Sequence, residues 1–301
     1  MDSRRPTKQR EVRTRIVDST RWNELRLRPG DIVVASWGKS GTTLTVQMVS
    51  QLLSSGAAGV GVRAPWVEAL PFAPKAKMLA AIESLPDPRL LKTHLPFDAL
   101  VFADEVRYVY VARDPRDVVW SAYNHHVSLT ANSIEAFNST GGEGPAIAPC
   151  TVSVRDYYLH WLERDELPGF TLNEPFWPHV RGWWAQRHLP NVLLMHHARI
   201  SADAAGEMRR LAAFLRIEID ERVFPTMLAH CRIDYMREHA ATLPAFTRIF
   251  ERGATSFFHS GTNGRWREVL TAQEIERCEA VAARELAPEC ARWLLTGLRP
   301  A

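Results

Sequence analysis

Four short apolar runs, each bounded by turn-forming residues, constrain the fold of this chain more than any other feature. They lie at residues 31–36, 90–92, 106–112 and 192–196. Apolar residues follow one another in these runs without regular polar alternation, which predicts strands buried on both faces. Such strands are typical of parallel sheets covered by helices on both sides.

Amphipathic helical patterns lie between and after these strands. Residues 42–53 place Leu44, Met48 and Leu52 on one stripe, and further helical patterns occupy residues 203–215 and 271–286. Strands that alternate with helices predict βαβ units. We therefore expect an α/β fold with an open, doubly wound parallel sheet flanked by helices, like the P-loop nucleotide fold.

The chain is expected to form one domain. The polar, glycine-rich stretch at residues 139–149 is interpreted as a surface loop, because the strand pattern resumes beyond it. Residues 26–301 are assigned to this domain. Residues 1–25 carry several arginines and are predicted to be a solvated basic tail.

Composition excludes several classes of protein. With 46% hydrophobic and 24% charged residues the chain is globular, and a net charge of +3 is too small to indicate a nucleic-acid partner. No apolar run reaches the roughly 18 residues of a membrane span. We expect a soluble cytoplasmic protein without a membrane partner. The scattered cysteines are expected to be reduced and not to bind metal; they are Cys150, Cys231, Cys278 and Cys290.

Residues 33–45 run from a buried strand through a small-residue turn into a helix. Gly38 and Gly41 allow close approach of a ligand to the backbone, and Lys39 supplies a positive charge. Free amides at a helix start bind anions. Hydroxyl groups add to this predicted phosphate site at Ser40, Thr42 and Thr43.

A nucleotide-hydrolysing or kinase P-loop is the nearest alternative, because Gly38-Lys39-Ser40 imitates the end of G-x-x-x-x-G-K-[ST]. The first glycine of that motif would fall at Val33, inside the strand. The wide loop that surrounds a β-phosphate cannot form there, and no strand-end acid is evident for Mg²⁺. An ATP-dependent kinase and a non-catalytic nucleotide-binding module remain as alternatives.

A second anion site is indicated after the strand at residues 106–112. Asp114 is suited to cap the next helix and Pro115 to begin it, which puts Arg113 at the strand end. Ser121 follows about two helical turns later, so a guanidinium and a hydroxyl can meet one phosphate. The alternative is a surface arginine and an unrelated helical serine.

Lys92 and His94 end the strand at residues 90–92. Residues two apart in an extended chain project from the same face, so a positive charge and a proton acceptor lie together. A histidine in this position can serve as a general base, or it can be a structural hydrogen-bonding residue.

These segments, taken in order, resemble the cytosolic-type sulfotransferases, which use 3′-phosphoadenosine-5′-phosphosulfate, and this chain is similar to their bacterial members. The resemblance covers about residues 31–286. It implies that residues 39–43 bind the 5′-phosphosulfate and that Arg113 and Ser121 bind the 3′-phosphate. It also implies that His94 is the catalytic base, that Lys39 stabilises the departing oxygen and that Lys92 holds the sulfuryl oxygens, with no metal. The nucleotide product would be adenosine 3′,5′-bisphosphate.

The C-terminal segment at residues 257–267 resembles the stretch that closes over the nucleotide in this family. Its glycines and Trp266 match, whereas His259 and Ser260 replace the expected Arg and Lys, and Arg265 replaces an Asp. The resemblance implies nucleotide contacts from His259, Ser260, Gly261 and Arg265. Either Arg265 or Arg267 compensates for the replaced cations, or the donor binds more weakly.

Recognition of the adenine departs further from the family pattern. Leu44, Ile233 and His197 stand where stacking aromatic residues and a Tyr are usual, so an apolar slot is expected to receive the base.

The acceptor is expected to be a small hydroxylated molecule, either a phenol or an alcohol. Phe97, Tyr123 and the loop at residues 139–149 are candidate contacts, whereas the tryptophans at 161–184 are assigned to the core. Residues 267–276 partly match a dimerisation motif of the family, which is compatible with a homodimer.

Overall fold

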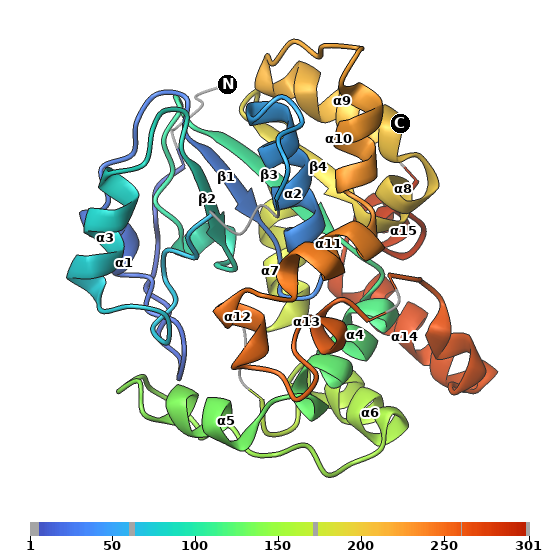
Figure 1. Ribbon diagram of the computed structural model, residues 1–301. Coiled ribbons are helices and arrows are strands. Elements are labelled where there is room, and N and C mark those ends of the chain that lie inside the picture. Colours follow the sequence, from blue (N-terminus) through green and yellow to red (C-terminus); the bar gives the residue numbers. More distant parts are fainter. Residues whose placement is uncertain (1–5, 60–63, 171–173, 260, 299–301) are drawn as a thin grey trace.

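The computed structural model describes residues 6–59, 64–170, 174–259 and 261–298. A parallel sheet with strand order β2-β1-β3-β4 lies at its centre (Figure 1). Its strands are β1 (Ile32–Ala35), β2 (Leu90–Thr93), β3 (Arg107–Ala112) and β4 (Val192–His196). The predicted parallel sheet is therefore confirmed, and each predicted strand is shifted by at most one residue at either end.

Helices connect the strands and cover both faces of the sheet (Figure 1). The first half of the chain contains α1 (Arg21–Glu24), α2 (Thr42–Leu53), α3 (Lys75–Glu83), the 3-10 helix η1 (Phe97–Ala99), α4 (Pro115–Val127) and α5 (Ala131–Asn138). The second half contains α6 (Val154–Arg164), α7 (Phe176–Ala185), α8 (His197–Ala202), α9 (Ala204–Leu215), α10 (Phe224–His230), α11 (Ile233–Ala240), α12 (Pro244–Thr247), α13 (Ala254–Phe257), the 3-10 helix η2 (Arg265–Glu268), α14 (Ala272–Glu285) and α15 (Pro288–Thr296). The predicted helix at 42–53 has the bounds of α2, while Asp203 and Thr271 cap α9 and α14.

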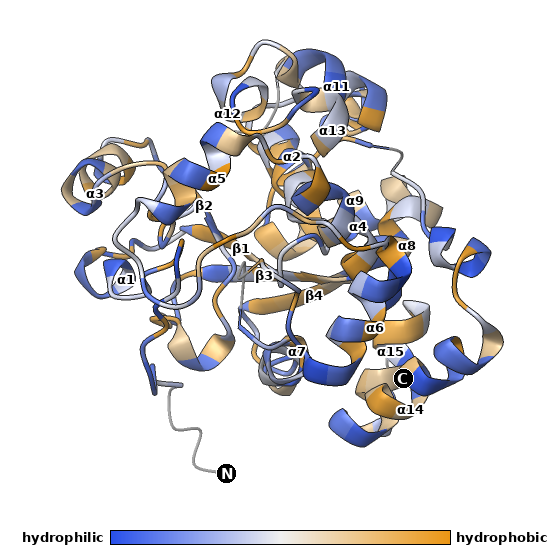
Figure 2. Ribbon diagram, turned by 90° about the horizontal axis from the view of Figure 1, so that it is seen from below, coloured by the Kyte–Doolittle hydropathy of each residue, from blue (hydrophilic) through white to orange (hydrophobic). Residues whose placement is uncertain are grey.

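Alternate residues of each strand enter two different cores, as the pleat of a strand requires. Val34 and Val109 pack against α2, α9 and α10, whereas Val33 and Tyr110 pack on the opposite face with aromatic residues of α7. The strands therefore pass through the middle of the molecule in hydrophobic colours (Figure 2). Burial on both faces explains why the strands lack polar alternation.

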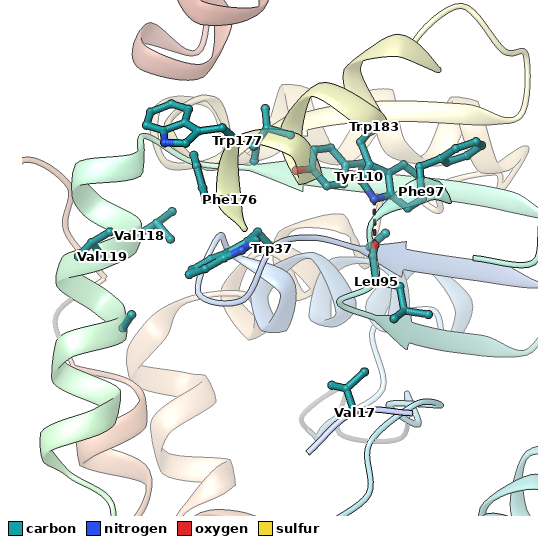
Figure 3. Packing of buried hydrophobic residues seen from close by; sticks show 14 of the residues in the cluster. Val17, Trp37, Leu95, Phe97, Tyr110, Val118, Val119, Phe176, Trp177 and Trp183 are labelled. Atoms are coloured by element: carbon teal, nitrogen blue, oxygen red, sulfur yellow. Dashed lines mark hydrogen bonds between the residues drawn. The ribbon is translucent and has the colours of Figure 1, made fainter. Parts of the chain in front are cut away.

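The aromatic face holds the loop after β2 in place. The Trp183 ring stacks on the Tyr110 ring with centroids 5.1 Å apart, and its indole N–H donates to the Leu95 carbonyl at 3.1 Å (Figure 3). Phe97 packs edge-on against the same indole at 5.2 Å. The prediction that the tryptophans at 161–184 belong to the core is confirmed, since Trp161, Trp177, Trp183 and Trp184 are all buried.

A buried ion pair stabilises the opposite end of the sheet. Asp31 immediately precedes β1 and Arg89 immediately precedes β2, and the Arg89 Nη2 to Asp31 Oδ2 distance is 2.6 Å with both side chains fully buried. The amino ends of these strands are thus joined by charge, while their carboxyl ends are open to a ligand.

The N-terminal segment differs from its predicted character. Residues 6–25 do not behave as a solvated tail, since Val12, Ile16 and Trp22 are buried in the core. Apolar residues between the arginines account for this, because they pack into the core, and even Arg21 is buried, where it donates to the carbonyls of Ala69 and Ala73. Arg10 pairs with Asp98 and Glu174.

Within the described ranges, no helix combines the length and the apolar character needed to cross a bilayer.

Candidate active site

A cavity of about 800 Å³ lies at the carboxyl ends of the strands, where ligands bind in open α/β sheets. Most of the predicted site residues line it, namely Lys39, Gly41, Thr42, Thr43, Leu44, Lys92, His94, Arg113, Ser121, His197, His259, Gly261 and Arg265. Ser40 is instead buried within the turn, where its amide donates to the Trp37 carbonyl. Ser260 lies outside the described residues.

The predicted anion loop at residues 39–43 has a backbone conformation at Gly41 that favours glycine. Gly41 precedes α2 with φ 111°, in a region that side chains disfavour. A Cβ atom there would lie 2.9 Å from Cδ2 of His197. The preceding Lys39 also has a positive φ of 69°, so the loop turns sharply before the helix begins. The Val33 position lies inside β1, as expected from the spacing that excludes a P-loop.

Lys39 projects into the cavity beside aromatic residues. Its Nζ lies 3.1 Å from Nδ1 of His125 and 4.5 Å from the centre of the Phe257 ring. Burial, followed by the nearby charges of Arg113 and Lys92, lowers the pKa of Lys39 to about 7. An anionic ligand would reverse this shift by favouring the protonated amine.

His94 is held in one orientation at the cavity wall. Its Nδ1 lies 2.8 Å from the Ser36 carbonyl oxygen, which can only accept, so this nitrogen carries the proton. The lone pair is then on Nε2. Burial, followed by the charge of Lys92, lowers the pKa of His94 well below its usual range and keeps the ring neutral. A neutral ring with a free lone pair is the form that a general base requires.

Ser36 connects this histidine to the anion loop. The Ser36 hydroxyl is 2.5 Å from the Thr42 hydroxyl at the start of α2, while the Ser36 carbonyl holds His94. One residue at the end of β1 therefore fixes both the loop and the candidate base.

Lys92 lies on the same wall as His94, as the strand pattern predicted. Its Nζ is 5.0 Å from the centre of the Trp66 ring, which also packs edge-on against His94 at 4.9 Å. Burial lowers the pKa of Lys92 to about 8, against the opposing influence of Glu68.

One face of α4 supplies several groups to the cavity. Asp114 caps the helix by accepting from the Arg116 amide and Pro115 begins it, as predicted. Asp117, Ser121, Asn124 and His125 share the cavity face because they recur every three to four residues.

The C-terminal segment crosses over Arg113 and α4. The Arg113 guanidinium donates to the Asn263 side-chain oxygen at 2.7 and 3.0 Å, and Asp117 accepts from the Gly264 amide at 2.7 Å. Arg265 faces the cavity with its Nη1 3.0 Å from Nδ1 of His259.

Arg267 does not share that position. Its guanidinium stacks 4.2 Å from the buried Trp266 ring. Of the two arginines that could replace the family's missing cations, Arg265 is the one that lines the cavity.

The remaining wall is largely apolar. Leu44, Ile233 and His197, which the sequence predicted to border the adenine, all line the cavity. Further apolar residues line it at Ile16, Pro71, Phe72, Met78, Phe137, Phe170, Phe246, Ile249 and Phe250. Such a wall is suited to a ligand with an apolar part.

The residues that the sequence predicted as acceptor contacts lie away from this cavity. Phe97, Tyr123 and residues 139–149 do not line this cavity. Phe97 turns into the core against Trp183, and Tyr123 packs against Tyr157 at 5.5 Å. Their side chains follow the packing of α6 and α7, which sequence spacing does not reveal.

Several cavity residues escaped the sequence patterns, among them His125, Trp66 and Arg232. His125 follows Ser121 by four residues on α4, so helical spacing could have identified it. Trp66 lies in a segment outside the named helices and strands, and Arg232 caps α11, and neither belongs to a periodic pattern.

Known proteins resemble this chain in sequence and in fold. The sulfotransferase domain family model matches residues 29–288. A glycolipid sulfotransferase of Mycobacterium bovis is 29% identical to the chain, with 99% of this chain and 98% of that protein covered. Sulfotransferase 1A1 of Rattus norvegicus is 26% identical, with 86% of this chain and 85% of that protein covered.

A solved structure has a similar fold. Mouse sulfotransferase SULT7A1 was crystallised in complex with PAP, which is adenosine 3′,5′-bisphosphate. Its structure superposes with a TM-score of 0.69 at 17% identity and covers 91% of this chain and 90% of that chain. Because the family model spans most of its length, the chain belongs to the sulfotransferase domain family.

Proposed function

We propose that this sulfotransferase moves a sulfuryl group from 3′-phosphoadenosine-5′-phosphosulfate to a hydroxyl of a small acceptor, with His94 as general base. The observation that carries this assignment is the position of Ser36. It holds Nδ1 of His94 through its carbonyl at 2.8 Å and contacts Thr42 of the anion loop at 2.5 Å. Because Ser36 contacts both the candidate base and the anion loop, it fixes their relative position, as group transfer between two ligands requires.

The charges around the cavity suit a donor with several negative groups. The cavity is lined by more basic than acidic side chains. The basic ones are Lys39, Lys92, Arg113, Arg232 and Arg265, and the acidic ones are Asp117 and Asp234. We assign the 5′-phosphosulfate to residues 39–43 and the 3′-phosphate to Arg113, Ser121, His259, Ser260 and Arg265, with Gly261 giving close backbone approach. Leu44 and His197 would border the adenine. Related structures that contain PAP favour the same donor.

The proposed reaction is an in-line displacement. His94 Nε2 accepts the proton of the acceptor hydroxyl as its oxygen forms a bond to sulfur. The bond from sulfur to the bridging phosphate oxygen breaks, and Lys39 stabilises the charge that develops on that oxygen. Lys92 and the loop amides hold the sulfuryl oxygens. The products are a sulfated acceptor and adenosine 3′,5′-bisphosphate.

The acceptor is proposed to combine a hydroxyl group with a substantial apolar part. The cavity wall is rich in aliphatic and aromatic side chains, among them Met78, Phe137 and Phe250. The mycobacterial relatives are named glycolipid sulfotransferases, which makes a glycolipid the first acceptor to test, followed by phenols and simpler alcohols.

Place of action and assembly are further proposals. All four cysteines are unpaired, which fits the reducing cytoplasm. A homodimer formed through residues 267–276 stays a prediction that analytical ultracentrifugation tests.

The test combines a transfer assay with nucleotide binding on His94→Gln. Labelled sulfate should pass from the donor to at least one acceptor among glycolipids, phenols and alcohols. The variant should lose about 10²- to 10⁴-fold in turnover while its affinity for adenosine 3′,5′-bisphosphate stays within about twofold of wild type, since His94 contacts no proposed phosphate site. Thermal stabilisation by ATP-Mg²⁺ but not by the bisphosphate would favour the kinase alternative. Bisphosphate binding without any transfer would favour the non-catalytic one.

A further inference from the structure

Glu68 is a buried carboxylate that none of the roles above uses. It lies between α2 and α3, and its side chain is fully buried. Four donors converge on its two oxygens: the His94 amide at 2.6 Å, the Thr93 hydroxyl at 3.0 Å and the indole N–H groups of Trp66 and Trp22 at 2.6 and 2.8 Å. A side chain with this many partners has a fixed position.

The donors around Glu68 suit the oxygens of a carboxylate. Burial raises the pKa of Glu68 above its usual value, and the hydrogen bonds from His94, Trp22 and Trp66 oppose this shift. These three partners are N–H groups, which can only donate. An amide in this place would set its own N–H₂ group against one of these donors, so the site is matched to the two oxygens of a carboxylate.

The same carboxylate fixes the main chain of the candidate base. His94 is held through its amide by Glu68, through its carbonyl by Nε2 of His179 at 3.2 Å, and through its ring by Ser36. Of these contacts, the amide contact with Glu68 is the shortest, at 2.6 Å. Displacement of this amide would move the whole residue relative to the anion loop.

Glu68 also orients the wall beside the base. It holds the Trp66 indole, whose ring packs against His94 and lies beneath the Lys92 amine. Its negative charge raises the pKa of Lys92, which otherwise faces the positive Lys39 and the neutral rings of His94 and His125.

We propose that Glu68 is a positioning residue for sulfuryl transfer, which holds the His94 main chain and the Trp66 ring and balances the charge of Lys92. This inference rests on the function proposed for His94. It assigns Glu68 no contact with either substrate.

Two substitutions separate the effect of the charge of Glu68 from the effect of its side-chain length. Glu68→Gln keeps the volume but removes the charge and offers an N–H₂ group to donors. Turnover should fall on the order of 10- to 100-fold. In the pH profile of kcat, the alkaline limb should move to lower pH, because Lys92 loses the negative charge of Glu68 that raises its pKa. Glu68→Asp keeps the charge but shortens the side chain. It should reduce kcat while leaving the alkaline limb in place.

The buried Asp31 provides the matched control, because it is also fully buried and ionic but lies at the amino end of the sheet. Asp31→Asn should lower the melting temperature without moving the alkaline limb. Affinity for adenosine 3′,5′-bisphosphate should be unchanged in both Glu68 variants.

The outcomes distinguish this inference from the function on which it rests. A wild-type kcat and pH profile in Glu68→Gln, beside an inactive His94→Gln, would overturn the role of Glu68 alone. Full activity of His94→Gln would overturn the proposed function. If Glu68→Gln does not fold, Glu68→Asp decides: reduced kcat with unchanged nucleotide affinity supports the role, and unchanged kcat refutes it.

Discussion

Lys39 Nζ lies 3.1 Å from Nδ1 of His125, so a neutral histidine engages the cation of the anion loop. Burial, with the charge of Lys39, lowers the pKa of His125 well below its usual range, which leaves Nδ1 free to accept from the amine. Ligand and histidine are therefore alternative partners for the same ammonium group.

Replacing His125 by Phe should strengthen nucleotide binding. The substitution keeps a ring against Phe170 and Phe250 but removes the acceptor for Lys39. A neutral hydrogen bond contributes about 0.5–1.5 kcal/mol, so the dissociation constant for adenosine 3′,5′-bisphosphate should fall about two- to tenfold. Isothermal titration calorimetry measures this constant. Weaker binding would instead mean that His125 holds Lys39 in its binding position.

Nucleotide affinity should decline as the pH rises through 7. Lys39 has a pKa of about 7 in the free protein, and an anionic ligand raises it, so binding requires proton uptake above that pH. Below pH 7 the amine is already charged and its contribution is complete. Lys39→Arg stays protonated and reports the titration of the nucleotide alone. Identical pH profiles for the two proteins would contradict the role of Lys39.

Arg265 and Arg267 should differ in their effect on the 3′-phosphate. Arg265→Ala should weaken adenosine 3′,5′-bisphosphate about 10- to 100-fold, the range of a charge-assisted hydrogen bond, and should leave AMP binding unchanged. Arg267→Ala is the control, because that guanidinium stacks on Trp266. Competition titrations with both nucleotides measure the difference. An equal loss for the two nucleotides in Arg265→Ala would place this arginine elsewhere on the ligand.

Acid should destabilise the protein partly through His179. Burial lowers the pKa of His179 to about 3, although the hydrogen bonds that its ring makes with the carbonyls of His94 and Leu95 oppose this shift. The neutral form is favoured in the fold, so its contribution is complete above the unfolded pKa of about 6.5 and is lost as the pH falls towards 3.

This loss amounts to about 1.4 kcal/mol per pH unit within that window. His179→Gln should therefore flatten the dependence of the unfolding free energy on pH between 4 and 6, although the protein is less stable at pH 7. Urea unfolding at a series of pH values measures the slope. A slope equal to that of the wild type would show that His179 does not titrate on unfolding.

Local patterns predicted the parts of the site that a single strand and its following turn create. The strand ending at Ala35, the turn at Lys39 and the helix from Thr42 are contiguous, so the position of Lys39 at the cavity follows from the local backbone. The same holds for Arg113 after β3 and for His94 after β2.

Contacts between distant segments could not be predicted in this way. Phe97 packs edge-on against Trp183 of helix α7 and does not line the cavity, a contact between segments far apart in the sequence. The buried Val12 and Trp22 were hidden among arginines, whose number suggested a solvated tail. Glu68 lies outside any helix or strand, and its partners come from three separate parts of the chain.

Ser36 contacts both His94 and Thr42, and this limits which segments can be exchanged between this chain and a relative. A chimaera that received residues 37–45 from a relative would acquire a new anion loop, but the tautomer of its base would still be set by the host's Ser36 carbonyl. The smallest exchangeable module of this enzyme therefore includes the end of β1 as well as the loop, and redesign of donor specificity has to treat both as one unit.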